Sequence, residues 1–348
     1  MSMAAHEEPR HRALIDLLEA EFAEQPDPST EVGQTHAGDR LHAHHYEASL
    51  VGPLRDFLAR PGKEFRARLV ECGYKLGGGS GDPPTLLPWI VEILHAGSLI
   101  VDDIEDGSPC RRGAPSLHVR YGLPLALNAG NWLYFWAESL VERLEVGPEI
   151  ELALHRTITR CLRECHRGQA LDLSLRMSQL TRSEVPVAVA TTTALKTGRL
   201  MELSATVGAL VSDAPAERVN AIARFGSELG TVLQMLDDLG GLYGERRIHK
   251  GHEDLRLSRP TWPWAWLAES LPHAHFESLR RDAVEVELGD RHPEQLAGRM
   301  RTGLGHEPKK RAHERSVRAF GRLKAQLGSP PALRDLSAEV SRLERSYD

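Results

Sequence analysis

The sequence is poor in cysteine, in aromatic residues and in long apolar runs. It has four cysteines in 348 residues, and aromatic residues make up 5% of the chain. Because the cysteines form no C-x-x-C pair, they predict reduced thiols of a cytoplasmic protein rather than a disulfide framework. The most apolar stretch, residues 86–101, is interrupted by Glu92 and His95 and is too short to span a bilayer. These absences argue against a disulfide-rich secreted protein and against a membrane span.

Positive charge is not in excess either. Lys and Arg number 43 against 49 Asp and Glu, which gives a net charge of -6. No basic tail or stripe stands out, so a nucleic-acid partner is not expected. Residues 1–20 lack a basic segment followed by an apolar one, and no signal peptide is predicted. With 41% hydrophobic and 26% charged residues, the composition is that of a globular cytoplasmic protein with an ample core.

Helical periodicity is present along most of the chain. Long amphipathic or apolar segments cover residues 88–106, 131–144, 151–173 and 218–239, whereas alternating strand patterns are scarce. Clusters of Gly and Pro lie between such segments, where helices are expected to stop. The pattern predicts an all-α fold, a single large helical bundle with one core. Residues 1–45 are polar and are predicted to form an N-terminal extension, so the all-α domain is expected to cover residues 46–348.

Acidic side chains end one of these apolar helices. The stretch LIVDDIEDGSPCRRG (99–113) places Asp102 and Asp106 one helical turn apart, with Arg111 and Arg112 close behind. Two carboxylates at i and i+4 repel each other and face the negative end of the helix dipole, unless a cation binds there. Ligands that offer only oxygen favour a hard cation such as Mg²⁺, which completes its shell with water and phosphate oxygens. The stretch therefore predicts a Mg²⁺ site.

A second apolar helix ends in the same way. The stretch LQMLDD (233–238) delivers Asp237 and Asp238 at the end of an apolar run. Two such helices predict a cavity with an acidic mouth and an oily interior. A cavity of this kind would hold a Mg²⁺-bridged diphosphate at its mouth and a hydrocarbon chain in its depth.

The motifs of the chain, taken in order, resemble those of the trans-isoprenyl diphosphate synthases, the polyprenyl synthetase family, and most closely its geranylgeranyl diphosphate synthases. The motifs that carry the resemblance are GKEFR (62–66), His95, DDIEDGSPCRRG (102–113), GQALDL (168–173), KTG (196–198) and QMLDDLGGL (234–242). The resemblance implies the isoprenoid synthase fold, one helical bundle around a central cavity. It also implies a homodimeric prenyltransferase that condenses isopentenyl diphosphate with an allylic diphosphate, most often to geranylgeranyl diphosphate.

The same resemblance implies roles for individual residues. The ligands of two or three Mg²⁺ ions would be Asp102, Asp106 and Asp237. The isopentenyl diphosphate anion would be bound by Lys63, Arg66, His95 and Arg112, since guanidinium groups grip phosphate oxygens in a bidentate way. Arg111 and Lys196 would neutralise the diphosphate leaving group, and the oxygens of Thr197, Gln169 and Gln234 would stabilise the allylic cation. The released diphosphate can accept the final proton, so no separate catalytic base is expected.

Two places depart from the family pattern. Gly241 stands where many relatives carry a third acid of the second motif, which puts the number of tightly held Mg²⁺ ions in doubt. In DLRLSRPTWP (254–263), Ser258 replaces a glycine, and Arg259 replaces a lysine expected to bind substrate. Arginine keeps the charge but changes its shape. These changes are interpreted as retuning rather than inactivation.

Product length is predicted from positions behind the first motif. Gly97 lies five residues before Asp102, about 7–8 Å along the helix, and Ser98 is beside it. Short-chain synthases tend to place an aromatic plug at this position, so its absence predicts an open upper tunnel. Tyr134 and Phe135 match a Tyr-Phe pair of geranylgeranyl synthases and are expected to form a deeper floor, although core packing is the alternative reading.

Three alternatives to this function stay open. A farnesyl diphosphate synthase would use the same residues and stop at fifteen carbons. A class I terpene cyclase would need the Mg²⁺ site and the cavity but not the isopentenyl diphosphate site. A non-catalytic subunit of a partner synthase should lose acids from its first motif, which is whole in this chain.

Overall fold

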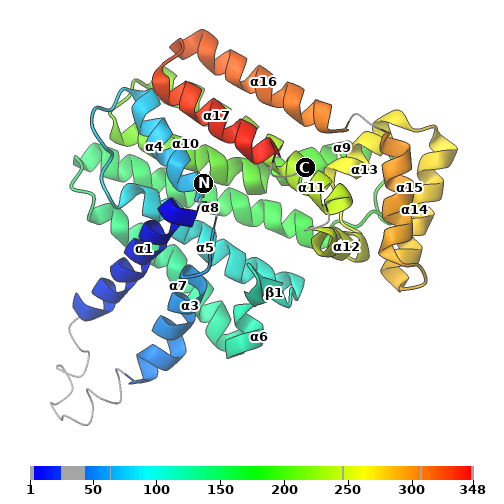
Figure 1. The fold of residues 1–348 in the computed structure, drawn as a ribbon, viewed down its shortest axis with the longest axis horizontal. Coiled ribbons are helices and arrows are strands. Elements are labelled where there is room, and N and C mark those ends of the chain that lie inside the picture. Colours follow the sequence, from blue (N-terminus) through cyan, green and yellow to red (C-terminus); the bar gives the residue numbers. More distant parts are fainter. Residues whose placement is uncertain (1–3, 25–43, 63, 245–246, 306–307, 346–348) are drawn as a thin grey trace. The chain divides into compact units, whose positions relative to one another are not determined.

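Helices form nearly all of the structure, a computed structural model that describes residues 4–24, 44–62, 64–244, 247–305 and 308–345 (Figure 1). Within these ranges the only strands are β1 (Cys110–Arg111) and β2 (Ala114–Pro115), which pair antiparallel. The predicted all-α fold is therefore confirmed. Among the described helices, none combines the length and the apolar composition that a membrane crossing needs.

The helices group into two units. Unit 1 comprises residues 1–67 and 85–145, and unit 2 comprises residues 68–84 and 146–348. This grouping does not test the division at residue 45, which stays a prediction. Residues 4–24, part of the predicted extension, form helix α1 (Ala4–Glu24), in which Leu14 and Leu18 are buried.

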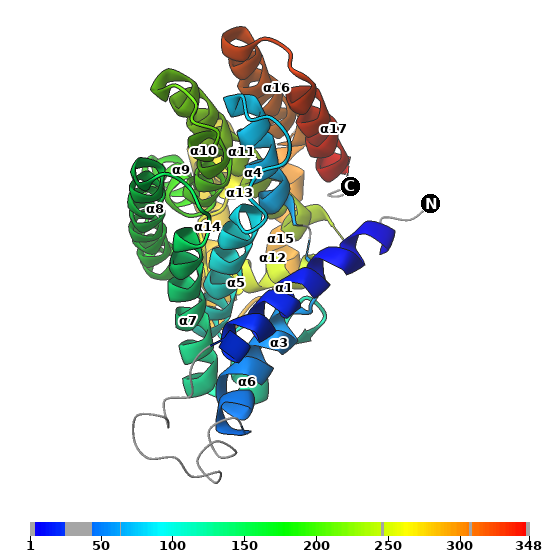
Figure 2. The ribbon, with the colours of Figure 1, turned by 90° about the vertical axis from the view of Figure 1, so that its left-hand side faces the viewer.

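Unit 1 is built around two long helices. Its elements are α1, the π-helical turn η2 (Glu47–Val51), α3 (Gly52–Leu58), α5 (Leu87–Asp106), the β1–β2 hairpin, α6 (Leu117–Tyr121) and α7 (Leu123–Glu142). Helices α5 and α7 pack side by side along much of their length (Figure 2). Helix α5 carries Pro88 in its first turn and ends at Gly107, which adopts a left-handed φ of 63°. Such a conformation suits glycine because it has no Cβ, and it stops the helix just after its acidic residues.

Unit 2 contains the other helices. They are α4 (Phe65–Gly77, from residue 68 onward), α8 (Pro148–Ser174), α9 (Glu184–Thr193), the π-helical turn η3 (Ala194–Gly198), α10 (Arg199–Val211), α11 (Ala216–Tyr243), α12 (Ile248–Arg256), α13 (Trp262–Ser270), α14 (His273–Leu288), α15 (Pro293–Leu304), α16 (Pro308–Leu327) and α17 (Pro331–Arg345). Helix α10 packs against both α8 and α11 (Figure 2). One continuous apolar core includes Met235 and Leu236 of α11 and Trp264 of α13. The aspartates that follow on α11 are thus attached to a helix that is firmly packed.

Helices α9 and α10 follow each other without a loop. The π-helical turn η3 joins them, so residues 184–211 form one helical run. Single π turns inside helices often mark functional sites. Here the turn carries Lys196 and Thr197, two of the predicted site residues.

Candidate active site

The first acidic site, defined as Asp102, Asp103 and Asp106, forms the last turn of α5 in unit 1. Asp103 is buried and accepts a hydrogen bond of 2.7 Å from Nε of Arg111. Burial raises the pKa of Asp103, and the hydrogen bond from Arg111 opposes this shift. Arg111 also lies 3.6 Å from Asp102. Arg111, predicted to neutralise the leaving group, is therefore held in place by Asp103, a partner that the sequence argument did not name.

The donor set of the first acidic site fits Mg²⁺. Asp102 and Asp106 offer carboxylate oxygens one helical turn apart, and a Mg²⁺ site needs only one or two protein carboxylates. Within the described ranges, no group of three or more His, Cys, Asp or Glu side chains is arranged to hold a metal ion. With Asp102 and Asp106 as ligands, the protein would supply part of the coordination shell, and water or substrate oxygens would supply the rest.

A basic cluster in the same unit is defined as Arg60, Arg66, Arg111 and Arg112, and three of these arginines, Arg66, Arg111 and Arg112, lie near His95. His95 is half-buried, and its buried Nδ1 has no hydrogen-bond partner among the described residues. Burial, together with the charges of Arg66 and Arg112, lowers the pKa of His95 well below its usual value. Burial and the neighbouring guanidiniums also lower the pKa of Arg112, although Glu92 opposes this shift. Arg60, Arg66 and Arg111 thus all act on Arg112, and such a concentration of positive charge favours the binding of an anion. Lys63, predicted to belong to it, lies outside the described residues.

The second acidic site, defined as Asp237 and Asp238, lies on α11 in unit 2. Asp237 forms an ion pair with Arg247, and its Oδ2 lies 3.6 Å from Nζ of Lys250. Its charge is thus already balanced by cations of the chain. Its carboxylate oxygens are therefore less available to Mg²⁺ than those of the first acidic site.

A chain of hydrogen bonds links three elements of unit 2. The hydroxyl of Thr197 donates to Oε1 of Gln234 at 2.6 Å, and Nε2 of Gln234 donates to Oδ1 of Asp238 at 2.8 Å. The backbone N–H of Trp262 donates to the other oxygen of Asp238 at 2.9 Å. Burial raises the pKa of Asp238 to about 7 in spite of these two hydrogen bonds. Thr197 and Gln234, both predicted site residues, are therefore in direct contact and share an orientation set by Asp238.

The two cations predicted for unit 2 converge on one carboxylate. Nζ of Lys196 lies 2.6 Å from Oδ2 of Asp172, and a guanidinium nitrogen of Arg259 lies 4.0 Å from the same oxygen. Arg259 is also 3.7 Å from Asp254, whose pKa burial raises to about 6. Asp172 and Asp254 are two site residues that were not predicted. Their signal was available, because Asp172 is the acid of the GQALDL segment and Asp254 opens the DLRLSRPTWP segment.

Gln169 and Ser258 flank this group. Gln169 is half-buried on α8, three residues before Asp172. Ser258 is buried and adopts a left-handed φ of 52°, and its carbonyl accepts a hydrogen bond from the N–H of Met177 at 2.8 Å. This conformation explains the glycine of the family pattern, because a residue without Cβ adopts it at least cost. Serine at this position therefore keeps the turn at the expense of some strain.

The predicted chain-length residues occupy different environments. A Cβ placed on Gly97 would lie 2.8 Å from the backbone oxygen of Gly130 and 3.2 Å from Cβ of Leu133. Gly97 thus faces the backbone of α7 and not free space, which removes the geometric support for an open tunnel at this position. Ser98 donates to the carbonyl of His95 at 2.8 Å. Phe135 is 74% exposed, so its ring adds no wall to the packed interior of unit 1.

Tyr134, unlike Phe135, lies beside Gly97 of α5. Its ring carbon Cε1 would be 3.5 Å from a Cβ on Gly97, and the side chain is half-buried. Of the two floor residues, only Tyr134 is thus placed beside α5.

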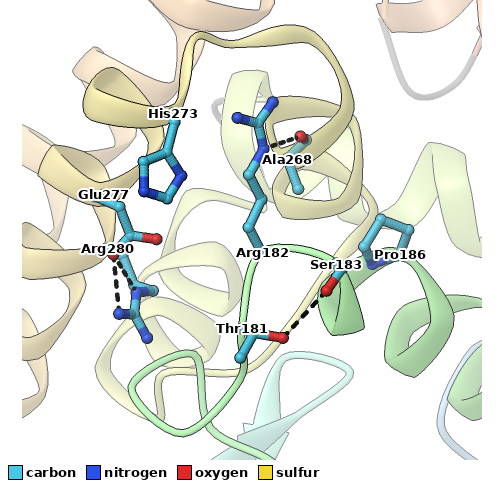
Figure 3. A pocket seen from close by; sticks show the side chains of 8 residues that line it. All are labelled: Thr181, Arg182, Ser183, Pro186, Ala268, His273, Glu277 and Arg280. Atoms are coloured by element: carbon cyan, nitrogen blue, oxygen red, sulfur yellow. Dashed lines mark hydrogen bonds and ion pairs between the residues drawn. The ribbon is translucent and has the colours of Figure 1, made fainter.

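A surface cleft in unit 2 contains none of the predicted residues (Figure 3). It has a volume of about 620 Å³ and lies between the start of α9 and the start of α14. Its two arginines mainly hold backbone and neighbouring side chains: Arg182 donates to the carbonyl of Ala268 at 2.6 Å, and Arg280 donates to Glu277 at 2.9 Å. The residues that line the cleft therefore give no support to a role in the predicted reaction.

Comparison with known proteins identifies the family of the chain. The family model for polyprenyl synthetase matches residues 47–284. A geranylgeranyl pyrophosphate synthase of Aspergillus versicolor is 32% identical over 67% of this chain and 59% of its own length. A farnesyl diphosphate synthase of Mycobacterium bovis is 33% identical over 59% of this chain and 56% of its own length. The chain thus matches less than two thirds of the length of these curated relatives.

Solved structures match nearly the whole chain. A geranylgeranyl pyrophosphate synthase of Lactobacillus brevis has a TM-score of 0.71 and 25% identity, and the match covers 97% of this chain and 96% of that one. A polyprenyl synthetase of Streptomyces coelicolor shares the fold with a TM-score of 0.71 at 20% identity, over 97% and 98% of the two chains. The chain belongs to the polyprenyl synthetase family.

Proposed function

We propose that this protein condenses isopentenyl diphosphate with an allylic diphosphate by head-to-tail prenyl transfer, and that its main product is geranylgeranyl diphosphate. The observation that carries the proposal is that unit 1 holds both the first acidic site and the partly buried basic cluster. An acidic site suits a diphosphate that is bridged by a metal ion, and a basic cluster suits a diphosphate that is bound without one. A condensing enzyme needs both, because both of its substrates are diphosphates.

The metal ligands in this proposal are Asp102 and Asp106, with Asp237 as a further ligand and two or three Mg²⁺ ions in total. When bound, Mg²⁺ supplies positive charge that stabilises the departing diphosphate. Arg111 would add positive charge beside Asp102, and Lys196 and Arg259 are proposed as substrate-binding cations on the strength of the family resemblance. Because Asp103 holds Arg111 and Asp172 holds Lys196, these cations are oriented before substrate arrives, at little further cost.

The isopentenyl diphosphate site is proposed to consist of Lys63, Arg66, His95 and Arg112. The lowered pKa of His95 keeps its imidazole neutral, so it adds a hydrogen-bonding group without adding to the repulsion among the arginines. The arginines bind the anion, and their own lost solvation is offset once its charge enters the cluster.

The allylic cation left by ionisation must be shielded from water and stabilised by dipoles. Gln169, Thr197 and Gln234 are proposed for this role, since Thr197 and Gln234 already contact each other at 2.6 Å. The hydroxyl proton of Thr197 points to Gln234, which leaves its oxygen lone pairs for a cation. The departing diphosphate is proposed to take the final proton.

The product assignment rests on the relatives rather than on a tunnel. The matched relatives include proteins named as geranylgeranyl pyrophosphate synthases and others named as farnesyl diphosphate synthases. A twenty-carbon product is therefore the main proposal, and a fifteen-carbon product is the second candidate. Tyr134 stays a proposed determinant of length because it lies beside α5.

A homodimer and a cytoplasmic location are also proposed. The homodimer is supported by large apolar side chains that helix α7 exposes, namely Leu123, Leu127 and Phe135. Such side chains on one helix are typical of a surface covered by a partner. The cytoplasmic location rests on the four cysteines, which the structure keeps as free thiols.

Product analysis tests the proposal. The protein is incubated with isopentenyl diphosphate and, in separate reactions, with dimethylallyl, geranyl or farnesyl diphosphate, with Mg²⁺ or with a chelator. Elongated diphosphates of twenty carbons that need both substrates and Mg²⁺ are expected. A cyclic hydrocarbon formed from the allylic substrate alone would show a terpene cyclase instead, and products that stop at fifteen carbons would favour the farnesyl synthase.

A further inference from the structure

Arg60, one of the four arginines of the basic cluster, lies outside all of the motifs that define the family in this chain. It follows the end of α3, two residues before the GKEFR segment. Its side chain is only 5% exposed, which is rare for arginine. Burying a guanidinium costs free energy unless hydrogen bonds and a nearby opposite charge replace its lost contacts with water. Arg60 has such partners.

Arg60 connects α3 to the β1–β2 hairpin. Its Nη1 donates to the backbone oxygen of Arg111 at 3.2 Å, and its Nη2 donates to Oδ2 of Asp56 at 3.0 Å. In return, Nη1 of Arg112 donates to the backbone oxygen of Arg60 at 3.3 Å. The guanidiniums of Arg60 and Arg112 also lie over the same ring, that of Phe57, at 5.5 and 5.7 Å from its centroid. Arg60 is thus bonded to both residues of the Arg111–Arg112 pair.

The turn that Arg60 holds is strained. Arg112 adopts a left-handed φ of 54°, which is disfavoured for a residue with a Cβ. Such backbone conformations persist only where surrounding contacts fix them. The hydrogen bond from Arg60 to the carbonyl just before Arg112 is one of those contacts.

The positive charge of Arg60 repels the other arginines of the basic cluster. It is one of the neighbouring charges that lower the pKa of Arg112. Asp56 balances part of this charge, and Asp56 also pairs with the more exposed Arg120 at 3.2 Å. An uncharged donor would avoid this repulsion. An arginine is favoured here because its planar fork can bond Asp56 and the carbonyl of Arg111 at the same time.

We propose that Arg60 is a positioning residue for the isopentenyl diphosphate site: bonded to Asp56 and to the Arg111 carbonyl, it holds the strained turn that places the Arg112 guanidinium. This inference rests on the proposed function for the identity of the anion. Arg60 is proposed to act through Arg112, because its side chain is only 5% exposed and its Nη groups donate to the Arg111 carbonyl and to Asp56.

Steady-state kinetics of Arg60→Met tests this role. The variant keeps much of the side-chain length and removes the donors. Its KM for isopentenyl diphosphate should rise about tenfold, the size expected when a charge-assisted hydrogen bond is lost, while its KM for the allylic diphosphate stays within about twofold. Arg60→Lys, which can donate to only one of the two acceptors at a time, should recover part of the loss. Arg120→Gln is the matched control, because it removes the exposed partner of Asp56 and should leave both KM values unchanged.

The double variant Arg60→Met/Arg112→Gln separates positioning from direct binding. If Arg60 acts through Arg112, the double variant is no worse than Arg112→Gln alone. Independent, multiplying effects would overturn the proposal, as would an unchanged KM in Arg60→Met. A lowered melting temperature with equal losses for both substrates would show a merely structural role and would overturn it too.

Failure of the proposed function can be told apart from failure of this inference. If the wild-type protein forms no elongated product from any allylic primer, the proposed function fails. Binding of inorganic diphosphate, measured by calorimetry with a chelator present, then still tests Arg60. Arg60→Met should weaken this binding about tenfold, and the loss should vanish in the Arg112→Gln background. Equal binding by wild type and Arg60→Met would refute the positioning role whatever the reaction is.

Discussion

Gly97 offers a direct test of how α5 and α7 pack. The substitution Gly97→Ala adds a single methyl group, and that methyl carbon would lie 2.8 Å from the backbone oxygen of Gly130 and 3.2 Å from Cβ of Leu133. Backbone cannot move aside as a flexible side chain can. The two helices must therefore separate or bend around the added methyl.

The expected cost follows from a matched glycine elsewhere. Gly321 is in the middle of α16, and a Cβ there would meet nothing within 4 Å. Replacing either glycine by alanine gains about 1 kcal/mol of helix propensity, because both are helical. Only Gly97→Ala also overpacks a contact, which costs about 1–3 kcal/mol. The free energy of unfolding of Gly97→Ala should thus be lower than that of Gly321→Ala by about 1–3 kcal/mol.

Urea unfolding of the two variants, followed by far-UV circular dichroism, measures this difference. Equal midpoints would refute the reasoning, because they would mean that the face of α5 at Gly97 has free space. Gly97→Phe would then become a fair test of chain length, with a shorter product expected. If the difference is found, Gly97→Phe is predicted to fail by misfolding, and product length must be sought at Tyr134 instead.

Three further predictions concern the acidic sites and the turn before α13. Asp102→Ala should lower turnover by several orders of magnitude in a product assay, because a proposed metal ligand is lost. The metal-free variant should unfold no earlier than wild type, because like-charge repulsion at the end of α5 is relieved. Near wild-type turnover would contradict the metal site. Ser258→Gly should raise the free energy of unfolding by about 1 kcal/mol in urea, since its left-handed φ of 52° suits glycine. Burial raises the pKa of Asp238 to about 7, so its contribution to stability is fully present below about pH 4 and is lost as the pH rises towards 7. In chelator, Asp238→Asn should therefore gain stability relative to wild type at pH 8 compared with pH 5, and a constant difference in unfolding midpoint would refute this.

Much of the fold and part of the site could be predicted from the sequence, for a physical reason. Helical periodicity and the position of Gly107 depend on neighbouring residues alone, and so does the i, i+4 spacing of Asp102 and Asp106. The proposed roles of Lys196 and Arg112 were inferred from the motifs of a family, and such motifs reflect the tertiary arrangement of its members indirectly.

The partners of the site residues could not be predicted in the same way. Asp103 is adjacent to Asp102, yet it is buried and accepts a hydrogen bond from Arg111 of strand β1. The pairing of Lys196 with Asp172 joins residues 24 positions apart, and nothing in the local pattern specifies it. The contact of Gly97 with Gly130 likewise depends on how two helices cross. Helix crossing and ion pairing are properties of the packed chain, so spacing along one helix does not reveal them.

The π-helical turn η3 has a consequence for how the chain can change. Within a regular helix, removing one residue rotates everything that follows by about 100°. Residues 184–211 form one helical run with a widened turn in the middle, and that turn holds Lys196 towards α8 and Thr197 towards α11. A π-helical turn closes on one residue more than an α-helical turn, so the widened turn at Ala194–Gly198 absorbs one residue within the run, and α9 and α10 each keep their own buried face. Deleting one residue there would let the helix close into regular geometry with α10 still presenting nearly the same side to its neighbours, but Lys196 and Thr197 would lose the turn that holds them towards α8 and α11.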